Sequence, residues 1–349
     1  MQNKKRRIIY EIYFPAFCKD LQDLTNKIHY FKELGVTTLW LTPIFPSPTE
    51  HGYDTTDYFN IKKEYGTLED FDNFVKKAHE NGLEVLLDLV LCHTSSEHKL
   101  FKDSIQGKND CYFWSDKKID DTWKICNDNG RYYQAKWYFT MPQLNNQSEQ
   151  VRDLIKDIIK FWLIDHDVDG FRLDAIKYAS GNPLAYWKWF CDEVYKIKPD
   201  CYLVGECWDT YEVSNKYAKT GMKTFNFEQA GWIKHSLNTG NPLVIKNDPK
   251  YDVNFLCNHD MSRISNSVGH DMNKLFKAVD MLFSLDGDVC IYYGDEINMG
   301  LNQDCHVEQG GYGDWKVRGK MDWHEVERQR KDPNSLFNYY KKKIKEYKK

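Results

Sequence analysis

The chain has 349 residues, enough to bury one large core or one core with a modest insertion. Its formal net charge is −4 with acids and bases interspersed, which argues against a nucleic-acid partner, so the basic runs at both ends are interpreted as solvated termini. No stretch approaches the ~18–20 apolar residues of a membrane span, and no apolar run follows the basic start as it would in a secretory signal. We therefore expect a cytoplasmic protein without a membrane partner.

Strand-like runs alternate with amphipathic segments along the chain. The runs that predict strands are residues 8–14, 37–41, 83–89, 168–173, 202–205, 223–227, 253–256 and 289–292. The segments that predict helices are residues 21–34, 68–81, 149–165, 184–197, 274–285 and 334–347, while the helix between the sixth and seventh strands is unclear. Glycines at 35 and 82 are expected to end the first two helices. Because parallel strands need a crossover, this order predicts an α/β fold with a parallel sheet, either a barrel or an open doubly wound sheet.

Four of the predicted strands end at ionisable residues. The sequences are DLVLCH at 88–93, GFRLD at 170–174, GECW at 205–208 and FLCNHD at 255–260. They fall at the third, fourth, fifth and seventh strands, whose ends share one face of a (β/α)8 TIM barrel, where active sites lie. We therefore favour the barrel. Its face would bring together Asp174, Glu206, Asp260, Arg172, His93 and His259.

The segment between the third predicted strand and the third predicted helix breaks the alternation. It spans about fifty residues, is rich in Trp, Tyr, Asn and Asp, and shows no clean helix. A loop of this length is usually functional or a small subdomain. We expect the barrel to comprise residues 1–93 and 148–349, with 94–147 as a small inserted domain that overhangs the pocket.

Three carboxylates beside an arginine are suited to glycoside chemistry. Cleavage with retention needs a carboxylate nucleophile and a protonated carboxyl about 5–5.5 Å apart. Asp174 is the better nucleophile, because Arg172 shares its face of the strand and is expected to lower its pKa. Glu206 follows apolar residues and precedes Cys207 and Trp208, so we expect desolvation to raise its pKa, as a general acid requires.

The remaining polar residues can assist this chemistry. Asp260 can hold sugar hydroxyls more tightly as positive charge develops on the ring, and His93 and His259 can donate hydrogen bonds to those hydroxyls. Each motif alone has a purely structural explanation, such as a salt bridge for an Arg-X-Asp pair. Their ordered occurrence at strand ends favours catalysis.

On these motifs the chain resembles the α-amylase family of glycoside hydrolases (glycoside hydrolase family 13), which are retaining (β/α)8 enzymes acting on α-glucans. Segment 51–58 is similar to the family's loop after strand two, 141–145 to the end of its inserted domain B, and 287–296 to its eighth strand and following loop. The resemblance implies that Asp174 is the nucleophile, Glu206 the acid/base and Asp260 the transition-state stabiliser. It also implies a set of substrate-binding residues: Tyr53, His93, Arg172, Lys177, Trp208 and His259.

The chain departs from the family's pattern at its usual calcium site, between barrel and domain B. Cys92 and Gln143 stand where the family has an asparagine and an acid, and Lys177-Tyr178 replaces Lys-His. A thiol is a poor ligand for a hard cation, so we expect no calcium there and no other cofactor. The ten cysteines also lack the spacing of a zinc site, and we expect no disulfide framework. The family's C-terminal β-sandwich is expected to be absent, because the sequence ends with the last predicted helix.

The leading hypothesis is a retaining hydrolase that cleaves α-1,4-glucosidic bonds in malto-oligosaccharides or starch-type glucans. Ala175 follows the nucleophile, where relatives that cleave α-1,6 bonds often carry valine, which favours the α-1,4 linkage. Asp54 and Arg318 resemble pairs that close the pocket of exo-acting members. A glucosyl or maltosyl transferase and a non-catalytic glucan-binding subunit are the alternatives, and the oligomeric state stays open.

Overall fold

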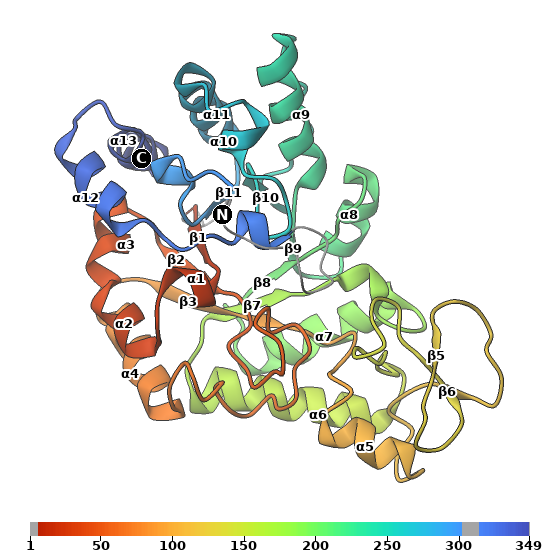
Figure 1. Ribbon diagram of the computed structural model, residues 1–349. Coiled ribbons are helices and arrows are strands. Elements are labelled where there is room, and N and C mark those ends of the chain that lie inside the picture. Colours follow the sequence, from red (N-terminus) through yellow and green to blue (C-terminus); the bar gives the residue numbers. More distant parts are fainter. Residues whose placement is uncertain (1–5, 302–313, 349) are drawn as a thin grey trace.

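Eight parallel strands close into a barrel in the computed structural model, which describes residues 6–301 and 314–348 (Figure 1). Their order in space is β1-β11-β10-β9-β8-β7-β3-β2, and β1 closes the barrel by pairing with both β2 and β11. The strands are β1 (Ile8–Ile12), β2 (Thr38–Leu41), β3 (Glu84–Leu89), β7 (Gly170–Leu173), β8 (Tyr202–Gly205), β9 (Lys223–Phe225), β10 (Asp252–Phe255) and β11 (Asp288–Tyr292). Each overlaps one predicted run, so the barrel is confirmed over the open doubly wound sheet.

Helices surround the barrel in Figure 1. They are α2 (Leu21–Asn26), α3 (Ile28–Leu34), α4 (Leu68–Glu80), α6 (Glu149–Lys160), α7 (Pro183–Ile197), α8 (Tyr211–Ala218), α9 (Phe227–Thr239), α11 (Met272–Ser284), α12 (Trp323–Lys331) and α13 (Leu336–Tyr347). Shorter helical turns are α1 (Phe14–Phe17), α10 (Ile264–Ser267), a π-helical turn (Phe161–Asp165) that extends α6, and 3-10 turns at Ile176–Tyr178, Asp295–Ile297 and Asp314–Val317.

The helices follow local signals where those signals are strong. Gly35 ends α3 with φ 93°, a conformation that glycine adopts without strain, as expected. A capping box formed by Thr67 and Asp70 begins α4. The predicted helix 21–34 is instead divided at Lys27 into α2 and α3. The sequence analysis also missed α8, whose eight residues give too short a pattern to stand out.

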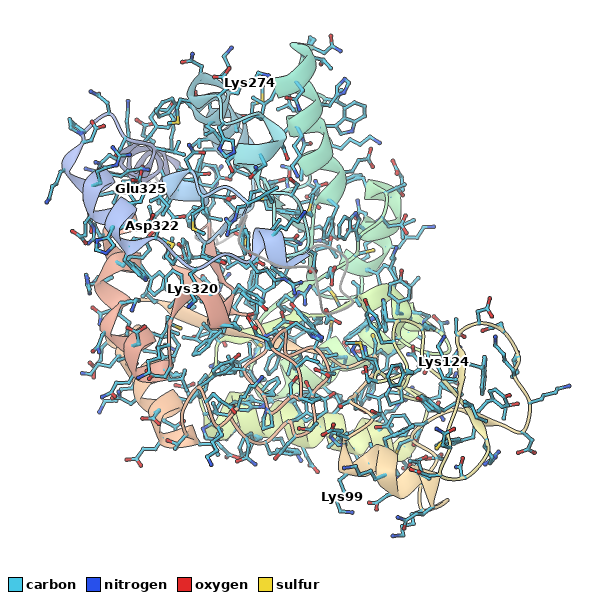
Figure 2. The ribbon with its side chains drawn as sticks, viewed as in Figure 1. Lys99, Lys124, Lys274, Lys320, Asp322 and Glu325 are labelled. Carbon is cyan, nitrogen blue, oxygen red and sulfur yellow. The ribbon has the colours of Figure 1, made fainter. Side chains whose placement is uncertain are left out.

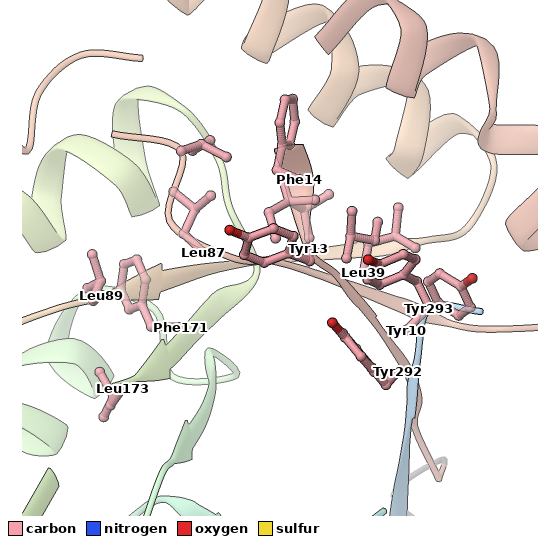
Figure 3. Close-up of a cluster of buried hydrophobic side chains, with 14 of the residues drawn as sticks. Tyr10, Tyr13, Phe14, Leu39, Leu87, Leu89, Phe171, Leu173, Tyr292 and Tyr293 are labelled. Atoms are coloured by element: carbon pink, nitrogen blue, oxygen red, sulfur yellow. The ribbon is translucent and has the colours of Figure 1, made fainter. Parts of the chain in front are cut away.

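Strand alternation builds the core. On the outer face, residues such as Tyr10, Leu39, Leu87 and Phe171 join one large buried cluster, part of which is drawn in Figure 3. The inward strand residues form a second, smaller cluster together with Phe227 and Ala230 of α9: Ile9, Trp40, Leu86, Tyr202, Val204, Phe225, Val253, Phe255 and Cys290. Both faces of the strands are therefore buried, as expected for a parallel sheet covered by helices.

The segment between β3 and α6 forms a lobe beside the barrel (Figure 1). It holds α5 (Lys99–Ile105) and an antiparallel sheet in the order β4-β6-β5, made of β4 (Trp114–Ser115), β5 (Trp123–Ile125) and β6 (Tyr132–Gln134). Figure 2 labels Lys99 and Lys124 in this lobe. The prediction of no helix here is wrong, because the segment contains the short helix α5. His98 caps the N-terminus of this helix, and its ring accepts a hydrogen bond from the Leu100 backbone N–H. The assignment of 94–147 as a separate domain stays a prediction.

Two of the sequence predictions concern membrane spans and the basic ends of the chain. In the described residues, no helix is both long enough and apolar enough to cross a membrane. Of the basic ends, residues 1–5 and 349 lie outside the described residues.

Substitution of Gly170 by alanine is expected to destabilise the barrel. A Cβ there would lie 1.9 Å from the carbonyl oxygen of Tyr202 on the neighbouring strand, so β7 and β8 would have to separate. We expect Gly170→Ala to lower the free energy of unfolding by about 3 kcal/mol or more, measured by urea denaturation.

The matched control is Gly231→Ala in α9, where no atom lies within 4 Å of the added Cβ. It is expected to be neutral or to stabilise by about 0.5–1 kcal/mol, because alanine favours the helix. Equal stability of Gly170→Ala and the unmodified protein would contradict the close approach of the two strands.

Candidate active site

The polar residues converge because strand alternation turns them into the barrel. Asp88 and Arg172 are paired in register across β3 and β7 and lie on the inward face. The hydrogen-bond ladder then continues past the strand ends: the backbone N–H of Asp174 donates to β3, and that of Glu206 donates to β7. Both carboxylates are thus held at the same end of the barrel.

A buried guanidinium joins these side chains. Arg172 is 1% exposed, and its Nη1 lies 2.8 Å from Asp88 Oδ1 and 2.9 Å from Asp174 Oδ1. Its Nη2 lies 2.6 Å from Glu206 Oε2. The guanidinium also sits 5.1 Å from the centre of the Trp40 ring. One cation therefore fixes both predicted reacting carboxylates.

Burial dominates the pKa values of these two carboxylates. Burial raises the pKa of Asp174 to about 6 against the opposing charge of Arg172, with Asp88 and Asp260 adding to the rise. Burial likewise raises the pKa of Glu206, as predicted for a general acid. Arg172 lowers the pKa of Asp174, as expected, but desolvation and two further carboxylates outweigh this one guanidinium, so the net shift is upward.

Asp260 lies in a different environment. Its Oδ1 is 2.6 Å from Arg318 Nη2, and its Oδ2 is 3.1 Å from His259 Nε2. Burial would raise the pKa of Asp260, but His259 and Arg318 outweigh burial and hold it well below its usual range. The structure places Arg318 against Asp260, while Asp54, its predicted partner, accepts a hydrogen bond from Ser47.

Tyr53 and His259 form a second connected group. The Tyr53 hydroxyl lies 2.7 Å from His259 Nε2 and donates to Asp88 Oδ2 at 3.1 Å. On the other side of the ring, His259 Nδ1 lies 2.6 Å from Glu11 Oε1. The two predicted substrate-binding residues thus lie together, and the Tyr53 hydroxyl connects them to Asp88, one of the carboxylates that Arg172 contacts.

His93 contacts the same loop from the other side. Its Nε2 lies 2.9 Å from the backbone oxygen of Tyr53, and its ring centre is 4.8 Å from that of Trp137. Burial lowers the pKa of His93 to about 4, so the ring is neutral at neutral pH. Because a carbonyl oxygen only accepts, Nε2 carries the proton and donates it to the Tyr53 backbone. His93 thus positions the Tyr53 backbone, and its donation to a sugar hydroxyl stays a prediction.

Lys177 and Trp208 lie together on the rim. Lys177 Nζ is 2.6 Å from the Trp208 carbonyl oxygen and 2.9 Å from Asp209 Oδ2. The Trp208 ring is 49% exposed and stacks on Phe227 at 5.0 Å. An exposed flat ring of this kind can contact the apolar face of a sugar.

Two buried acids of the site, Glu11 and Asp88, were not among the residues that the sequence analysis predicted. Both are acids within apolar strands, at positions where alternation points them inward. A charged residue on the inner face of a wholly buried strand is the signal that could have identified them, because a buried carboxylate requires a partner.

The positions of the family's usual calcium site do not fit a hard cation. The amide nitrogen of Gln143 donates to the carbonyl oxygens of Cys92 (2.8 Å) and Tyr178 (2.9 Å). Lys136 Nζ lies 3.3 Å from the same Tyr178 oxygen, and the Cys92 thiol donates to the Ala175 carbonyl at 3.5 Å. Both carbonyl oxygens already face N–H donors, and a thiol is a poor ligand for calcium. Within the described residues, no group of three or more His, Cys, Asp and Glu side chains could hold a metal ion.

Comparison with known proteins places this geometry in a family. The family model for the α-amylase catalytic domain matches residues 15–349. Alpha-amylase 3 of Dictyoglomus thermophilum is 37% identical over 380 residues, covering 97% of this chain and 76% of that protein. The 4-alpha-glucanotransferase of Thermotoga maritima is 29% identical, covering 95% and 84%. The crystal structure of an alpha-amylase from H. orenii is similar with a TM-score of 0.85 and 31% identity, covering 98% and 81%. The chain belongs to the α-amylase family of glycoside hydrolases, glycoside hydrolase family 13.

Proposed function

We propose that this protein is a retaining hydrolase of α-1,4-glucosidic bonds in malto-oligosaccharides or starch-type glucans. The observation that carries the proposal is the Arg172 guanidinium, which holds Asp174 and Glu206 at the ends of adjacent strands. Two carboxyl groups flanking one bond are what double displacement requires. The named activities of the relatives, an alpha-amylase among them, supply the α-glucan substrate class.

The proposed reaction has two steps. In the first, a carboxylate oxygen of Asp174 bonds to the anomeric carbon as the glycosidic C–O bond breaks, and Glu206 gives its proton to the leaving oxygen. In the second, Glu206 takes a proton from water, whose oxygen displaces Asp174. Asp260 stays ionised and stabilises the positive charge that develops on the sugar ring in both steps.

The electrostatics of the site favour one proton on the Asp174–Glu206 pair. Burial raises the pKa of both Asp174 and Glu206, and each charge opposes ionisation of the other, so the pair retains a proton to higher pH than isolated carboxyls would. Both carboxylates accept from Arg172, and Glu206 also accepts from the Ala175 N–H, so we assign the proton to Glu206 from the resemblance to the family. A singly protonated pair is the state from which the first step begins.

A transferase with the same covalent intermediate is the second candidate. Two relatives are named as 4-alpha-glucanotransferases, and the exposed Trp208 offers a contact for a sugar acceptor in place of water. A non-catalytic glucan-binding subunit has less support, since three carboxylates and their partners are kept in one cluster.

We also propose that the protein is cytoplasmic and that residues 94–147 are the family's domain B. All nine cysteines of the described residues are free and buried, which fits a reducing compartment. The lobe formed by α5 and the small sheet supports the domain assignment.

Catalysis is tested with maltoheptaose, resolving each product and its anomeric form over time. The expected products are short maltosaccharides released as α-anomers, and longer products at high maltose concentration would instead indicate transfer.

Asp174→Asn and Glu206→Gln are each expected to lower kcat/KM by about 10³-fold or more. With a 4-nitrophenyl maltoside, whose leaving group needs little protonation, the loss should shrink for Glu206→Gln only. Full activity of either variant, or release of β-anomers, would refute the proposal.

The pH dependence follows from the Asp174 carboxyl. The nucleophile must be ionised, and its pKa is raised to about 6, so kcat/KM should fall as pH drops through about 6. Glu206 must be protonated, so activity should also fall on the alkaline side. A kcat/KM profile on maltoheptaose from pH 4 to 9 measures both limbs. An acid limb near the ordinary aspartate pKa of about 3.9 would contradict the strong burial of Asp174.

We propose that the protein needs no calcium between barrel and insertion, because Gln143 and Lys136 occupy the carbonyl oxygens there. Dialysis against EDTA is expected to leave the unfolding temperature and kcat/KM unchanged. Gln143→Ala leaves the buried Cys92 carbonyl without this donor and removes one of two donors from the Tyr178 carbonyl, which should cost about 1–3 kcal/mol of unfolding free energy. The control is Lys160→Ala at an exposed position at the end of α6, which should leave the unfolding free energy nearly unchanged. Loss of stability on chelation, restored by calcium, would refute this proposal.

A further inference from the structure

Glu11 is a buried carboxylate that the proposed reaction does not use. It lies within β1, in the otherwise uncharged sequence IIYEI, and its side chain is 1% exposed. Strand pairing sets it between Trp40 on β2 and Tyr292 on β11, inside the barrel. A carboxylate in such a place is costly unless a partner compensates its charge.

His259 is that partner. Glu11 Oε1 lies 2.6 Å from His259 Nδ1 and accepts from the His259 backbone N–H at 3.2 Å. No other hydrogen bond to this carboxylate is found within the described residues, and its Oε2 is buried without a partner there. The carboxylate is thus committed to one residue of the candidate active site, from the opposite side of the ring to the substrate pocket residues.

The hydrogen-bond directions around His259 require two ring protons. Nδ1 faces a carboxylate, so Nδ1 carries a proton. The Tyr53 hydroxyl donates its single proton to Asp88, so its oxygen must accept from His259 Nε2 at 2.7 Å. With an unprotonated Nε2, its lone pair would also face Asp260 Oδ2 at 3.1 Å. Both nitrogens are therefore donors, and the ring is an imidazolium.

We propose that Glu11 is a positioning residue that keeps His259 as an imidazolium and fixes its Nε2–H on Tyr53 and Asp260. The fixed cation keeps Asp260 ionised and holds the Tyr53 hydroxyl in place. Its kinetic consequence rests on the proposed glycosidase function, whereas the protonation state does not.

Charged and titratable groups from every neighbouring element act on this pair. They are Asp260 beside the ring, Tyr53 after β2, Asp88 on β3, Arg172 on β7, Arg318 before α12, and, around Glu11, Cys290 and Tyr292 on β11 and Asp295 after it. Burial alone would lower the pKa of His259, but Asp260 and then Glu11 outweigh it and raise the pKa to about 10. Without the Glu11 charge, His259 keeps only Asp260 as an anionic partner. The lowering of its pKa by burial is then opposed less, so the pKa of His259 falls.

Nuclear magnetic resonance of protein labelled with ¹⁵N-histidine tests the protonation state directly. His259 is assigned among the 11 histidines as the signal missing from His259→Gln. At pH 8 the unmodified protein should show both His259 ring nitrogens protonated, and Glu11→Gln should show one. Glu11→Asp, which keeps the charge, should retain the imidazolium. A neutral His259 in the unmodified protein at pH 8, or an imidazolium in Glu11→Gln, would overturn the proposal.

Kinetics separate this role from a merely structural one. The ratio of kcat/KM for Glu11→Gln to that of the unmodified protein cancels the titration of Asp174 and Glu206. It should fall at least about threefold between pH 6 and pH 8, because a lower pKa discharges His259 over this range. A ratio independent of pH would overturn the proposal.

The matched control is Glu296→Gln, which changes a buried carboxylate that contacts Tyr10 on the outer side of β1. Its ratio should be constant with pH. If the protein hydrolysed no α-glucan, the kinetic arm would fail together with the proposed function, and the magnetic resonance arm would still decide the protonation state of His259.

Discussion

The buried guanidinium of Arg172 is the interaction on which the candidate active site depends. It is 1% exposed and contacts carboxylates of Asp88, Asp174 and Glu206. A buried charge without a partner costs several kcal/mol, so neither the cation nor the carboxylates would stay charged there alone. Since an apolar replacement of such a cluster is often no less stable, the cluster is better explained by what it does than by stability. It fixes the ends of three neighbouring strands relative to one another.

Burial then divides the carboxylates into two kinds. Asp174 and Glu206 share one guanidinium, and desolvation raises the pKa of each. Asp260 lies against two cationic groups, His259 and Arg318, and these outweigh desolvation and lower its pKa. The same end of the barrel thus provides a pair of carboxyls whose pKa values burial raises and a third carboxylate that stays ionised. Those are the properties that the two steps of the proposed reaction require.

The sequence was informative where a signal is local. Four of the predicted strands end in a visible change from apolar to ionisable residues, and strand alternation alone placed Arg172 and Asp174 on one face. The partner of Glu11 could not be found in this way, because His259 lies 248 residues further along the chain and meets it only when β1 closes the barrel. The net upward shift of the Asp174 pKa was missed for a related reason: the depth of burial depends on the packed barrel and leaves no mark in the sequence around it.

The insertion is coupled to the reacting groups through hydrogen bonds to Cys92 and Tyr178. Gln143 bonds the carbonyl oxygens of Cys92 and Tyr178, and the Cys92 thiol bonds that of Ala175. Ala175 is held with φ 46°, a left-handed conformation that is strained for a residue other than glycine, and this aims its N–H at Glu206 Oε2 at 3.1 Å. Such a conformation persists only when its surroundings fix it. The contacts through Gln143 and Cys92 provide that support, so the lobe beside the barrel helps to set the position of the residue proposed to carry the catalytic proton.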